Sequence, residues 1–536
     1  MEHPPSESIV EEIGGLFEDQ ELSENVEMWA RLLEYPAPSF RRVALDIEVF
    51  SPISTRVPDP TKAEHPVICA TLLGTDGRKR VLLLKRKNMK EGIGKLPSDV
   101  EVEYYPTEQQ LISQIFRALQ DYPFIITFNG DDFDLRYLWH RARNLGLGRE
   151  QNPIQVGRRV CLLNRNIHLD LYKFFYNRSI QIYAFNQKYR DVTLDSVGKA
   201  LLGMEKLELD KPISQLSYLE LAHYCFRDAQ ITLQLTRFDD DLVMKLILAL
   251  ARISRMPLED VSRLGVSRWI RNFLHYEHRR RNILIPDKED ILIAKGKTTT
   301  KAIIKGKKYK GAIVVDPVPG VHFNVKVMDF ASLYPSIIKV HNLGYQTIRC
   351  PHSQCEEDKV PDTPHWVCTK QRALESLLIG SMRDLRVRWY KPKSKNEELP
   401  NQLRSWYNVI QSALKVILNA SYGVFGAETF DLYCPPVAEA TASLGRHVIT
   451  QTINKAQELG IQVIYGDTDS VFLKDPTTEQ IETLASWSEE ELGMELEVDK
   501  VYRYSIFSSR KKNYLGVLPD GNIDVKGLTG KKRHIP

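Results

Sequence analysis

Apolar runs separated by polar segments predict buried strands early in the chain. The segment RRVALDIEVF (41–50) is apolar apart from its charged ends and two acids, which is typical of a buried strand. The apolar runs PVICATLLG and KRVLLLK follow it and predict a hairpin. Amphipathic segments and short strands continue to about residue 240, where LTRFDDDLVMKLILALARIS predicts a long helix. The chain before residue 40 is expected to be weakly structured.

Later in the chain, VKVMDF (325–330) predicts a strand, and residues 346–371 are irregular, polar and rich in cysteine. A helix is predicted over about 369–391, ended by Pro392, because apolar residues recur along one side. These residues are Leu374, Leu377, Leu378, Leu385 and Trp389. A second helix is predicted from Asn401, a good N-cap, to Gly423, a natural C′ residue. Two such helices between strand-rich segments predict a helical hairpin inserted into a sheet domain.

Composition places the chain among ordinary globular proteins of several domains. Its 536 residues predict three to four domains, and 43% of them are hydrophobic. No apolar run of about eighteen residues predicts a membrane span, and the acidic N-terminus does not resemble a signal peptide. Seven scattered cysteines favour a reducing compartment over a disulfide framework. We therefore expect a cytoplasmic protein without a membrane partner.

The net charge of +4 is small, but basic residues are unevenly distributed. Residues 1–30 contain no Lys or Arg, whereas the C-terminal half contains five basic clusters. These clusters are 278–282, 295–311, 390–395, 510–514 and 530–536. Any one of them could be a solvated surface, but together they favour a phosphate backbone as partner.

A first set of acids comes from three segments of the predicted sheet region. Asp46 and Glu48 are two apart on a strand, so both point to the same face. Asp134 lies in FNGDDFDLRYL, and Tyr224 and Asp228 lie four apart on a predicted helix. Four converging carboxylates are ligands for two hard divalent cations, and the tyrosine could orient an attacking water. The alternative for the strand pair alone is a solvated sheet edge.

A second set of acids lies in the C-terminal half. Asp329 ends the predicted strand VKVMDF, and VIYGDTDSVFL (463–473) predicts a hairpin with Asp467 and Asp469 at its tip. A solvated acidic turn is the alternative for this tip. Lys415, Asn419 and Tyr422 share one face of a predicted helix and would suit triphosphate oxygens and a flat base. The lysine can neutralise phosphate oxygens, the asparagine can hydrogen-bond them, and the tyrosine can form a wall near a base.

The motifs DIE, NG–FD and Y-x-x-x-D, in this order and spacing, resemble the 3′–5′ proofreading exonuclease of DNA polymerases over roughly residues 40–235. The resemblance implies that four acids hold metal ions and that Tyr224 positions the nucleophile. The four acids are Asp46, Glu48, Asp134 and Asp228.

The motifs DFASLYPS, K-x-x-x-N-x-x-Y-G and YGDTDS resemble motifs A, B and C of family B DNA polymerases, and further details look archaeal. The resemblance implies a template-directed DNA polymerase that adds deoxynucleotides to a primer 3′ end by two-metal phosphoryl transfer with Mg²⁺, for which Mn²⁺ can substitute. Asp329 and Asp469 would be the main ligands, with Asp467 nearby. Two rival hypotheses are an exonuclease with an inert polymerase half and a non-catalytic DNA-binding subunit.

The same resemblance assigns residues to the incoming nucleotide and to DNA. Tyr334, next to Leu333, matches the gate that excludes a ribose 2′-hydroxyl, and Arg386 matches a phosphate contact for which Arg383 and Arg388 compete. Among the DNA contacts, Lys512 and Tyr514 are expected in RKKNYLG, and Tyr309 and Gly311 in YKGA. In YKGA the family more usually has a second glycine at the position of Ala312. Contacts of this kind in the minor groove test pairing geometry without reading sequence.

The resemblance implies an α/β and α+β multidomain fold with an RNase H-like exonuclease domain, a ferredoxin-like palm with an antiparallel sheet, and helical-hairpin fingers. The expected divisions are 1–40, a partial N-terminal region; 41–240, the exonuclease; 241–345, linker helices and the first part of the palm; 346–371, a cysteine-bearing insertion; 372–425, the fingers; and 426–536, the second part of the palm, with the thumb absent.

We expect primer-template DNA and deoxynucleoside triphosphates as partners, a second polypeptide that supplies the thumb, and a sliding clamp as a further candidate.

The irregular segment offers a separate metal site. The pattern C-x₄-C…H-x₂-C predicts a small structural zinc site formed by Cys350, Cys355, His365 and Cys368. His352 is a competing ligand, and a disulfide or ordinary packing remain alternatives.

Overall fold

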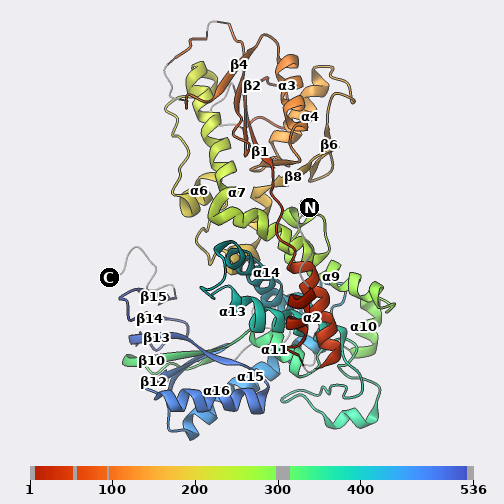
Figure 1. The fold of residues 1–536 in the computed structure, drawn as a ribbon, viewed down its shortest axis with the longest axis vertical. Coiled ribbons are helices and arrows are strands. Elements are labelled where there is room, and N and C mark those ends of the chain that lie inside the picture. Colours follow the sequence, from red (N-terminus) through yellow and green to blue (C-terminus); the bar gives the residue numbers. More distant parts are fainter. Residues whose placement is uncertain are drawn as a thin grey trace. The chain divides into compact units, whose positions relative to one another are not determined.

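The computed structural model describes residues 7–17, 19–51, 57–87, 89–92, 96–296 and 314–527. The chain forms two compact units (Figure 1). The described parts of Leu32–Phe273 and Lys393–Val416 make the first unit, and those of Ser6–Arg31, Leu274–Pro392 and Ile417–Pro536 make the second. In these residues no helix has the length and apolar character needed to cross a membrane.

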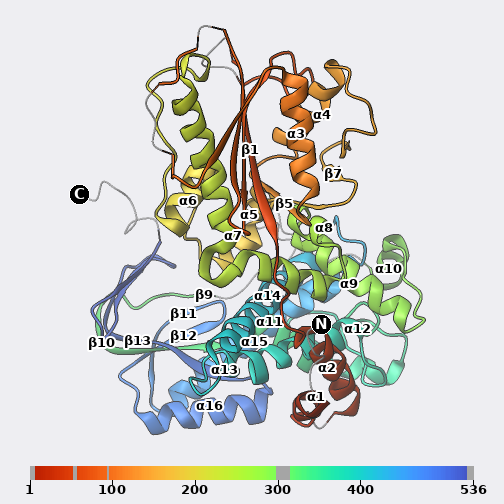
Figure 2. The same ribbon diagram turned by 45° about the horizontal axis from the view of Figure 1, so that its top comes forward.

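The first unit is built on a six-stranded mixed sheet. Its strand order is β4 (Glu101–Tyr105), β3 (Lys79–Leu84), β2 (Val67–Gly74), β1 (Arg42–Val49), β5 (Phe124–Thr127) and β8 (Ile167–Asp170). The predicted buried strand and hairpin are confirmed, since β1 pairs antiparallel with β2 and β2 pairs antiparallel with β3. Helices α3 (Glu108–Gln120) and α7 (Tyr218–Ser254) cover opposite faces of the sheet (Figure 2). The central strand β1 is therefore enclosed on both faces.

Smaller elements complete the first unit. They are α4 (Asp134–Asn144), β6 (Ile154–Val156), β7 (Cys161–Leu163), α5 (Leu171–Tyr176), α6 (Leu194–Leu202) and α8 (Leu258–Arg263).

The long helix predicted from residue 235 is interrupted. Within α7, Phe238–Asp241 leave the helical conformation, and three consecutive aspartates have positive φ. Aspartate adopts this left-handed conformation more readily than most residues because its short side chain can bond locally. The buried guanidinium of Arg42 donates to Thr236 Oγ1 at 2.7 Å and pairs with Asp241. The break therefore turns the chain around a buried cation.

The second unit is built on a seven-stranded antiparallel sheet. Its order is β15 (Ile523–Lys526), β14 (Tyr514–Val517), β13 (Leu496–Phe507), β10 (Gly320–Phe330), β12 (Ser470–Lys474), β11 (Gln462–Asp467) and β9 (Val314–Val315). Helices α15 (Pro435–Glu458) and α16 (Thr478–Leu492) pack against this sheet, and α11 (Leu333–Val340) follows β10 directly. The predicted strand at 325–330 is confirmed as the end of the long central strand β10.

The expectation of a weakly structured start is wrong for the described residues. Helices α1 (Glu7–Gly14) and α2 (Gln20–Leu33) occupy it. Their apolar residues are buried at helical spacing, including Val10, Ile13, Val26 and Trp29. Many acidic residues lie between these positions. Their number made the segment read as polar, although its apolar residues recur at helical spacing.

The two later helices differ from their predicted bounds. The first begins as α12 (Leu374–Asp384), continues as a π-helical stretch at Leu385–Tyr390 and ends as the short helix α13 (Lys391–Lys393). The second, α14 (Asn401–Phe425), runs through Gly423, so the prediction of a helix end at that glycine is wrong. Its first turn bonds to the carbonyl of Pro400, one residue before the predicted cap. Helices α9 (Val266–Arg280) and α10 (Lys288–Lys295) precede these elements.

Candidate active sites

Three carboxylates from β1 and α7 converge in the first unit. Ligand oxygens of Asp46, Glu48 and Asp228 all lie within 4.8 Å of one another. The two-residue spacing on β1 puts its acids on one face, and α7 packs on that face. Asp134 lies beside them at the start of α4, where its Oδ1 accepts a hydrogen bond from the Ile47 N–H at 3.2 Å. It is not part of the close group.

Burial raises the pKa of every acid in this cluster. Burial, followed by the charge of Asp228, raises the pKa of Glu48 to about 8. Burial raises the pKa of Asp134 to about 7. The pKa values of Asp46 and Asp228 also lie above their ordinary range, chiefly because both groups are removed from water. The ionised form of these acids is therefore disfavoured unless a further positive charge lies beside them.

Lys206 is a residue of this site that the sequence analysis missed. Its Nζ lies 2.5 Å from Asp228 Oδ2 and 5.4 Å from the centre of the Tyr224 ring. Burial lowers the pKa of Lys206, but the charge of Asp228 and the hydrogen bond to it outweigh burial and raise it above its ordinary value. Burial raises the pKa of Tyr224 to about 12, so its phenol stays protonated at neutral pH. Lys206 lies outside regular structure, where no periodic spacing could have identified it.

In the second unit, strand pairing brings Asp329 to the acidic hairpin. Strand β10 pairs with β12, and Asp329 lies opposite Ser470. Asp467 is also opposite Ser470, so Thr468 and Asp469 form a two-residue loop between β11 and β12. Thr468 has a φ of 52°, in the left-handed region that tight hairpin loops require. The Phe330 N–H donates to the Asp469 carbonyl at 3.0 Å, which joins the strand end to the loop.

The three acids of this site differ in their surroundings. Removal from water, followed by the charge of Asp469, raises the pKa of Asp329 to about 8. Removal from water and then the charge of Asp467 raise the pKa of Asp469 to about 6. Asp467 instead forms an ion pair with Lys512, with 2.8 Å between Oδ1 and Nζ. Unlike the acids of the first unit, these three do not form a described group with all ligand oxygens within 4.8 Å.

The residues predicted to contact the nucleotide lie on α11 and α14. Leu333 is buried at the start of α11, and the ring of Tyr334 stacks on that of Tyr422, with 4.2 Å between centroids and 20° between planes. Lys415 and Asn419 precede Tyr422 on α14 at the predicted spacing, and all three side chains are partly exposed. Val416, Ile417 and Leu418 between them are buried, so this helix presents a polar stripe beside its apolar face.

The three arginines that are candidates for the predicted phosphate contact have different partners in the structure. Arg383 is buried and pairs with Asp384 and Glu495. Arg388 also approaches Glu495, at 3.8 Å. Arg386 lies in the π-helical stretch, and its Nη1 donates to Ser332 Oγ at 3.1 Å. Burial and the charge of Arg383 lower the pKa of Arg386 to about 10. Arg386 is thus directed to the residue that immediately precedes α11.

The predicted DNA contacts divide into three groups. Lys512 is bound to Asp467, as described above. Tyr514 packs in an aromatic cluster with Tyr465, Phe472 and Phe507, whose ring lies 5.2 Å away. Tyr309 and Gly311 lie outside the described residues, as does most of the lysine-rich stretch.

The four predicted zinc ligands are not all brought together. Cys350, Cys355 and Cys368 converge with His352. His365 lies elsewhere, with Nδ1 accepting from Arg349 at 2.9 Å and Nε2 bonded to Glu439 at 2.9 Å.

Comparison with known proteins identifies the family of the chain. The family model "DNA polymerase family B" matches residues 256–535, more than half of the chain. The chain belongs to DNA polymerase family B. The model of the family B exonuclease domain matches residues 19–187. The predicted family is therefore confirmed, and the two mixed α/β units belong to a family B polymerase fold with an exonuclease domain.

Archaeal relatives match almost the whole chain. It is 48% identical to DNA polymerase 1 of Sulfurisphaera ohwakuensis over 98% of this chain and 61% of that protein. It is 46% identical to DNA polymerase 1 of Saccharolobus solfataricus over 99% of this chain and 61% of that protein. The structure of the family B DNA polymerase from Pyrobaculum calidifontis is similar with a TM-score of 0.64 and 25% identity, over 92% of this chain and 60% of the other. The chain therefore spans about six tenths of the length of these relatives.

Proposed function

We propose that this protein is a template-directed DNA polymerase that adds deoxynucleotides to a primer 3′ end and removes mispaired ends with a 3′–5′ exonuclease. The main support is that the family B motifs of both activities fold into two separate acidic sites. The convergence of Asp46, Glu48 and Asp228 within 4.8 Å carries the nuclease assignment. The pairing of Asp329 with the Asp467–Asp469 hairpin carries the polymerase assignment.

Both acid sets fit divalent metal ions. Carboxylate oxygens are the ligands that Mg²⁺ and Mn²⁺ prefer. Burial and neighbouring acids raise the pKa values of Glu48 and Asp329 to about 8, so a cation bound beside them would favour their ionised form. In the first unit Asp46, Glu48 and Asp228 would hold the metal, with Asp134 nearby. A divalent cation held by these carboxylates would offset their charge and would supply Lewis-acid activation of the attacking oxygen.

In the exonuclease, the residues of the chain would position water and neutralise charge. The Tyr224 phenol is protonated at neutral pH and can orient a water toward the scissile phosphate. Lys206 holds Asp228 by an ion pair and lies over the Tyr224 ring, so it fixes the positions of both groups. We assign Lys206 as a positioning residue of the nuclease.

In the polymerase, Asp329 and Asp469 would be the main metal ligands. Asp467 is the weaker ligand because Lys512 already offsets its charge at 2.8 Å. Lys415, Asn419 and Arg386 would bind the triphosphate, and their donors suit phosphate oxygens. Tyr334 would exclude a 2′-hydroxyl, and its ring is braced by the stacked ring of Tyr422.

The topology also supports a finer domain description. The mixed sheet of the first unit is consistent with an RNase H-like exonuclease at about residues 41–240, and the antiparallel sheet of the second unit with a ferredoxin-like palm in two parts. Residues 372–425 would form the fingers, and 346–371 an insertion between palm and fingers. Primer-template DNA and deoxynucleoside triphosphates are the proposed partners, and Lys512 the proposed contact to the primer duplex.

Two matched substitutions test the proposal. Asp469→Ala is expected to abolish primer extension and leave 3′ trimming unchanged, because each site has its own acids. Asp46→Ala is expected to do the reverse. The measurement is extension and trimming of a labelled primer with paired and unpaired 3′ ends, by the chain alone and with any polypeptide that copurifies with it.

The same assay separates the rival functions. An exonuclease with an inert polymerase half would trim but never extend, with or without a copurifying polypeptide. A non-catalytic DNA-binding subunit would do neither. Loss of both activities in each variant, with normal folding, would contradict two independent sites.

A further inference from the structure

A long irregular segment connects α11 to α12 in the second unit. Between Val340 and Leu374 the regular structure consists of a 3₁₀ turn at Ser353–Glu357 and two isolated bridges, Ile348–Val367 and Lys359–Trp366. Segments of this length without helices or strands are uncommon in compact domains unless a function or a cross-link accounts for them. Four aliphatic side chains of the segment are buried, Leu343, Ile348, Val360 and Val367. Its one concentrated cluster consists of three cysteines with Trp366 against them.

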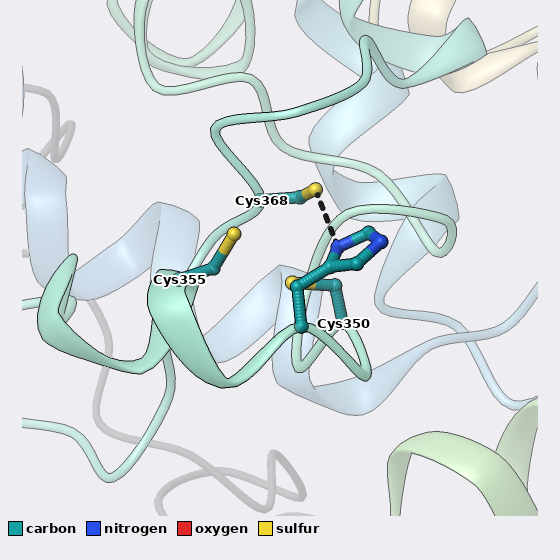
Figure 3. Close-up of side chains that lie close together, drawn as sticks. Cys350, Cys355 and Cys368 are labelled. Atoms are coloured by element: carbon teal, nitrogen blue, oxygen red, sulfur yellow. Dashed lines mark hydrogen bonds between the residues drawn. The ribbon is translucent and has the colours of Figure 1, made fainter.

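Four side chains of the segment converge on one point. Ligand atoms of Cys350, His352, Cys355 and Cys368 all lie within 4.8 Å of one another, and His352 Nδ1 lies 3.4 Å from Cys368 Sγ. Figure 3 shows the three cysteine side chains directed toward a common space from separate parts of the loop. In a tetrahedral zinc site the ligand atoms are about 3.5–3.8 Å apart, given Zn–S of about 2.3 Å and Zn–N of about 2.0 Å. The observed group needs only a small contraction to reach this geometry.

The surroundings of the sulfurs suit thiolates. All three cysteines are buried, with at most 2% exposure. The Thr369 N–H points to Cys355 Sγ at 3.5 Å, and the Lys370 N–H points to Cys368 Sγ at 3.4 Å. Backbone N–H groups directed at ligand atoms are a common second layer of support in metal sites, because they stabilise the negative charge of the ligands. No disulfide joins these cysteines, and all seven cysteines of the chain are free.

Hydrogen bonding explains why His352, and not His365, belongs to the group. The Arg349 Nε–H donates to His365 Nδ1, so this nitrogen is an acceptor, and Nε2 must carry the proton that it shares with Glu439. Both ring nitrogens of His365 are therefore used. His365 is fully buried and connects the irregular segment to Glu439 on α15.

We propose that Cys350, His352, Cys355 and Cys368 bind one structural Zn²⁺ ion. Binding releases the protons of the three thiols, and the imidazole contributes a neutral nitrogen, so the site carries a net charge of −1. Four protein ligands leave no open position for water or substrate, which makes the role structural. The ion would cross-link the connection between α11, with its predicted nucleotide-binding tyrosine, and α12.

Zinc content of the purified chain tests the proposal directly. After dialysis against EDTA at neutral pH, one zinc per chain is expected by mass spectrometry, with release only when a mercurial reagent titrates the thiols. Replacement with Co²⁺ should give the visible bands of tetrahedral cobalt and a sulfur-to-cobalt charge-transfer band in the near ultraviolet. These measurements on the unsubstituted chain do not depend on any variant folding.

Variants then identify the ligands. Cys355→Ser and His352→Ala are expected to lose zinc, whereas Cys434→Ser, a buried cysteine outside the group, and His365→Gln are expected to keep it. The far-ultraviolet circular dichroism spectrum and the thermal midpoint report whether each variant chain is otherwise folded, and neither depends on the proposed activities. Zinc retained by His352→Ala but lost by His365→Gln would assign the other histidine and overturn the proposed ligand set.

Three results would overturn the zinc site itself. One is a metal-free chain in which all seven thiols react after denaturation. Another is a mass two hydrogens lower than the reduced chain, which identifies a disulfide. The third is iron with acid-labile sulfide in place of zinc.

Discussion

At the scale of single residues, the acids of the first unit are held together against their repulsion. Lys206 is the cation that lowers the pKa values of Asp46, Glu48 and Asp228, yet all three remain above their ordinary range. Protons therefore compete with metal ions for these oxygens near neutral pH. Because metal ligation requires the deprotonated form, exonuclease activity should rise with pH until the carboxylates are ionised.

Replacing Lys206 by Ala should move the acid limb of the exonuclease pH profile upward. Removing the cation raises the carboxylate pKa values further, so a higher pH is needed to ionise them; we expect a shift of about one unit, or ~1.4 kcal/mol. Lys199→Ala is the matched control, since Lys199 pairs with Glu205 and is 67% exposed. Single-turnover trimming rates measured across pH test this. An acid limb that coincides with that of the control would exclude the assigned role of Lys206.

Replacing Tyr334 by Ala should admit ribonucleotides. The ring is the group that would meet a 2′-hydroxyl, and its loss opens that space, while Tyr334→Phe keeps the ring and should keep the discrimination. We expect the preference for deoxynucleotides to fall by about tenfold or more, which corresponds to ~1.4 kcal/mol. The measurement is kcat/KM for dNTP and rNTP on the same primer-template. Equal discrimination by the Ala and Phe variants would refute the gate.

At the scale of elements, local backbone conformation decides where helices turn or end. The pattern of LTRFDDDLVMKLILALARIS predicts one helix, but Asp239, Asp240 and Asp241 adopt positive φ between two helical parts of α7. The buried guanidinium of Arg42 forms an ion pair with Asp241 in this non-helical stretch. In the second unit, the π-helical stretch similarly places Arg386 toward Ser332. Both departures are stabilised by contacts with residues distant in sequence.

Substitutions at Asp239 should report the strain of the break. Its φ of 46° suits Gly and is unfavourable for a β-branched residue. Asp239→Val should destabilise the first unit by about 1–2 kcal/mol and lower its thermal midpoint by roughly 2–8 °C. Asp239→Gly should leave the midpoint unchanged or raise it slightly. Calorimetry of both variants tests this, and a Val variant as stable as the Gly variant would contradict the left-handed conformation.

At the scale of the whole molecule, the charge clusters differ in what they can bind. In the cluster at 278–282, Arg280 and Arg281 face the buried carboxylate of Glu277, at 2.8 and 3.8 Å. Their charge is thus partly used within the fold. Arg510, by contrast, is exposed beside the predicted DNA contact Lys512. The sequence clusters therefore overstate the number of cations that face a phosphate backbone.

Salt dependence of DNA binding should distinguish these clusters. Arg510→Ala should reduce the slope of log K against log salt by about 1, because one phosphate contact is lost. Arg280→Gln should leave the slope unchanged. Binding of primer-template DNA measured by fluorescence anisotropy at several salt concentrations tests this. A reduced slope for Arg280→Gln alone would reverse the assignment.

The sequence by itself predicted the family and the central strands β1 and β10, and it identified the acids that make up the two candidate sites. These features are local: alternation on a strand, a four-residue spacing on a helix and a short hairpin are encoded by neighbouring residues. Asp46 and Glu48 had to share a face, and Tyr224 and Asp228 had to share another, whatever the rest of the chain did.

Only the tertiary structure decided the features that depend on distant partners. Lys206 meets Asp228 because a loop returns to α7, and no spacing encodes that contact. Arg383 differs from Arg386 because the fold places the carboxylates of Asp384 and Glu495 beside it. His352 replaces His365 in the cysteine cluster because Arg349 and Glu439 occupy both nitrogens of His365. In each case the sequence gives the residue type. Whether its charge or lone pair can still bind a ligand depends on the groups that the fold places beside it.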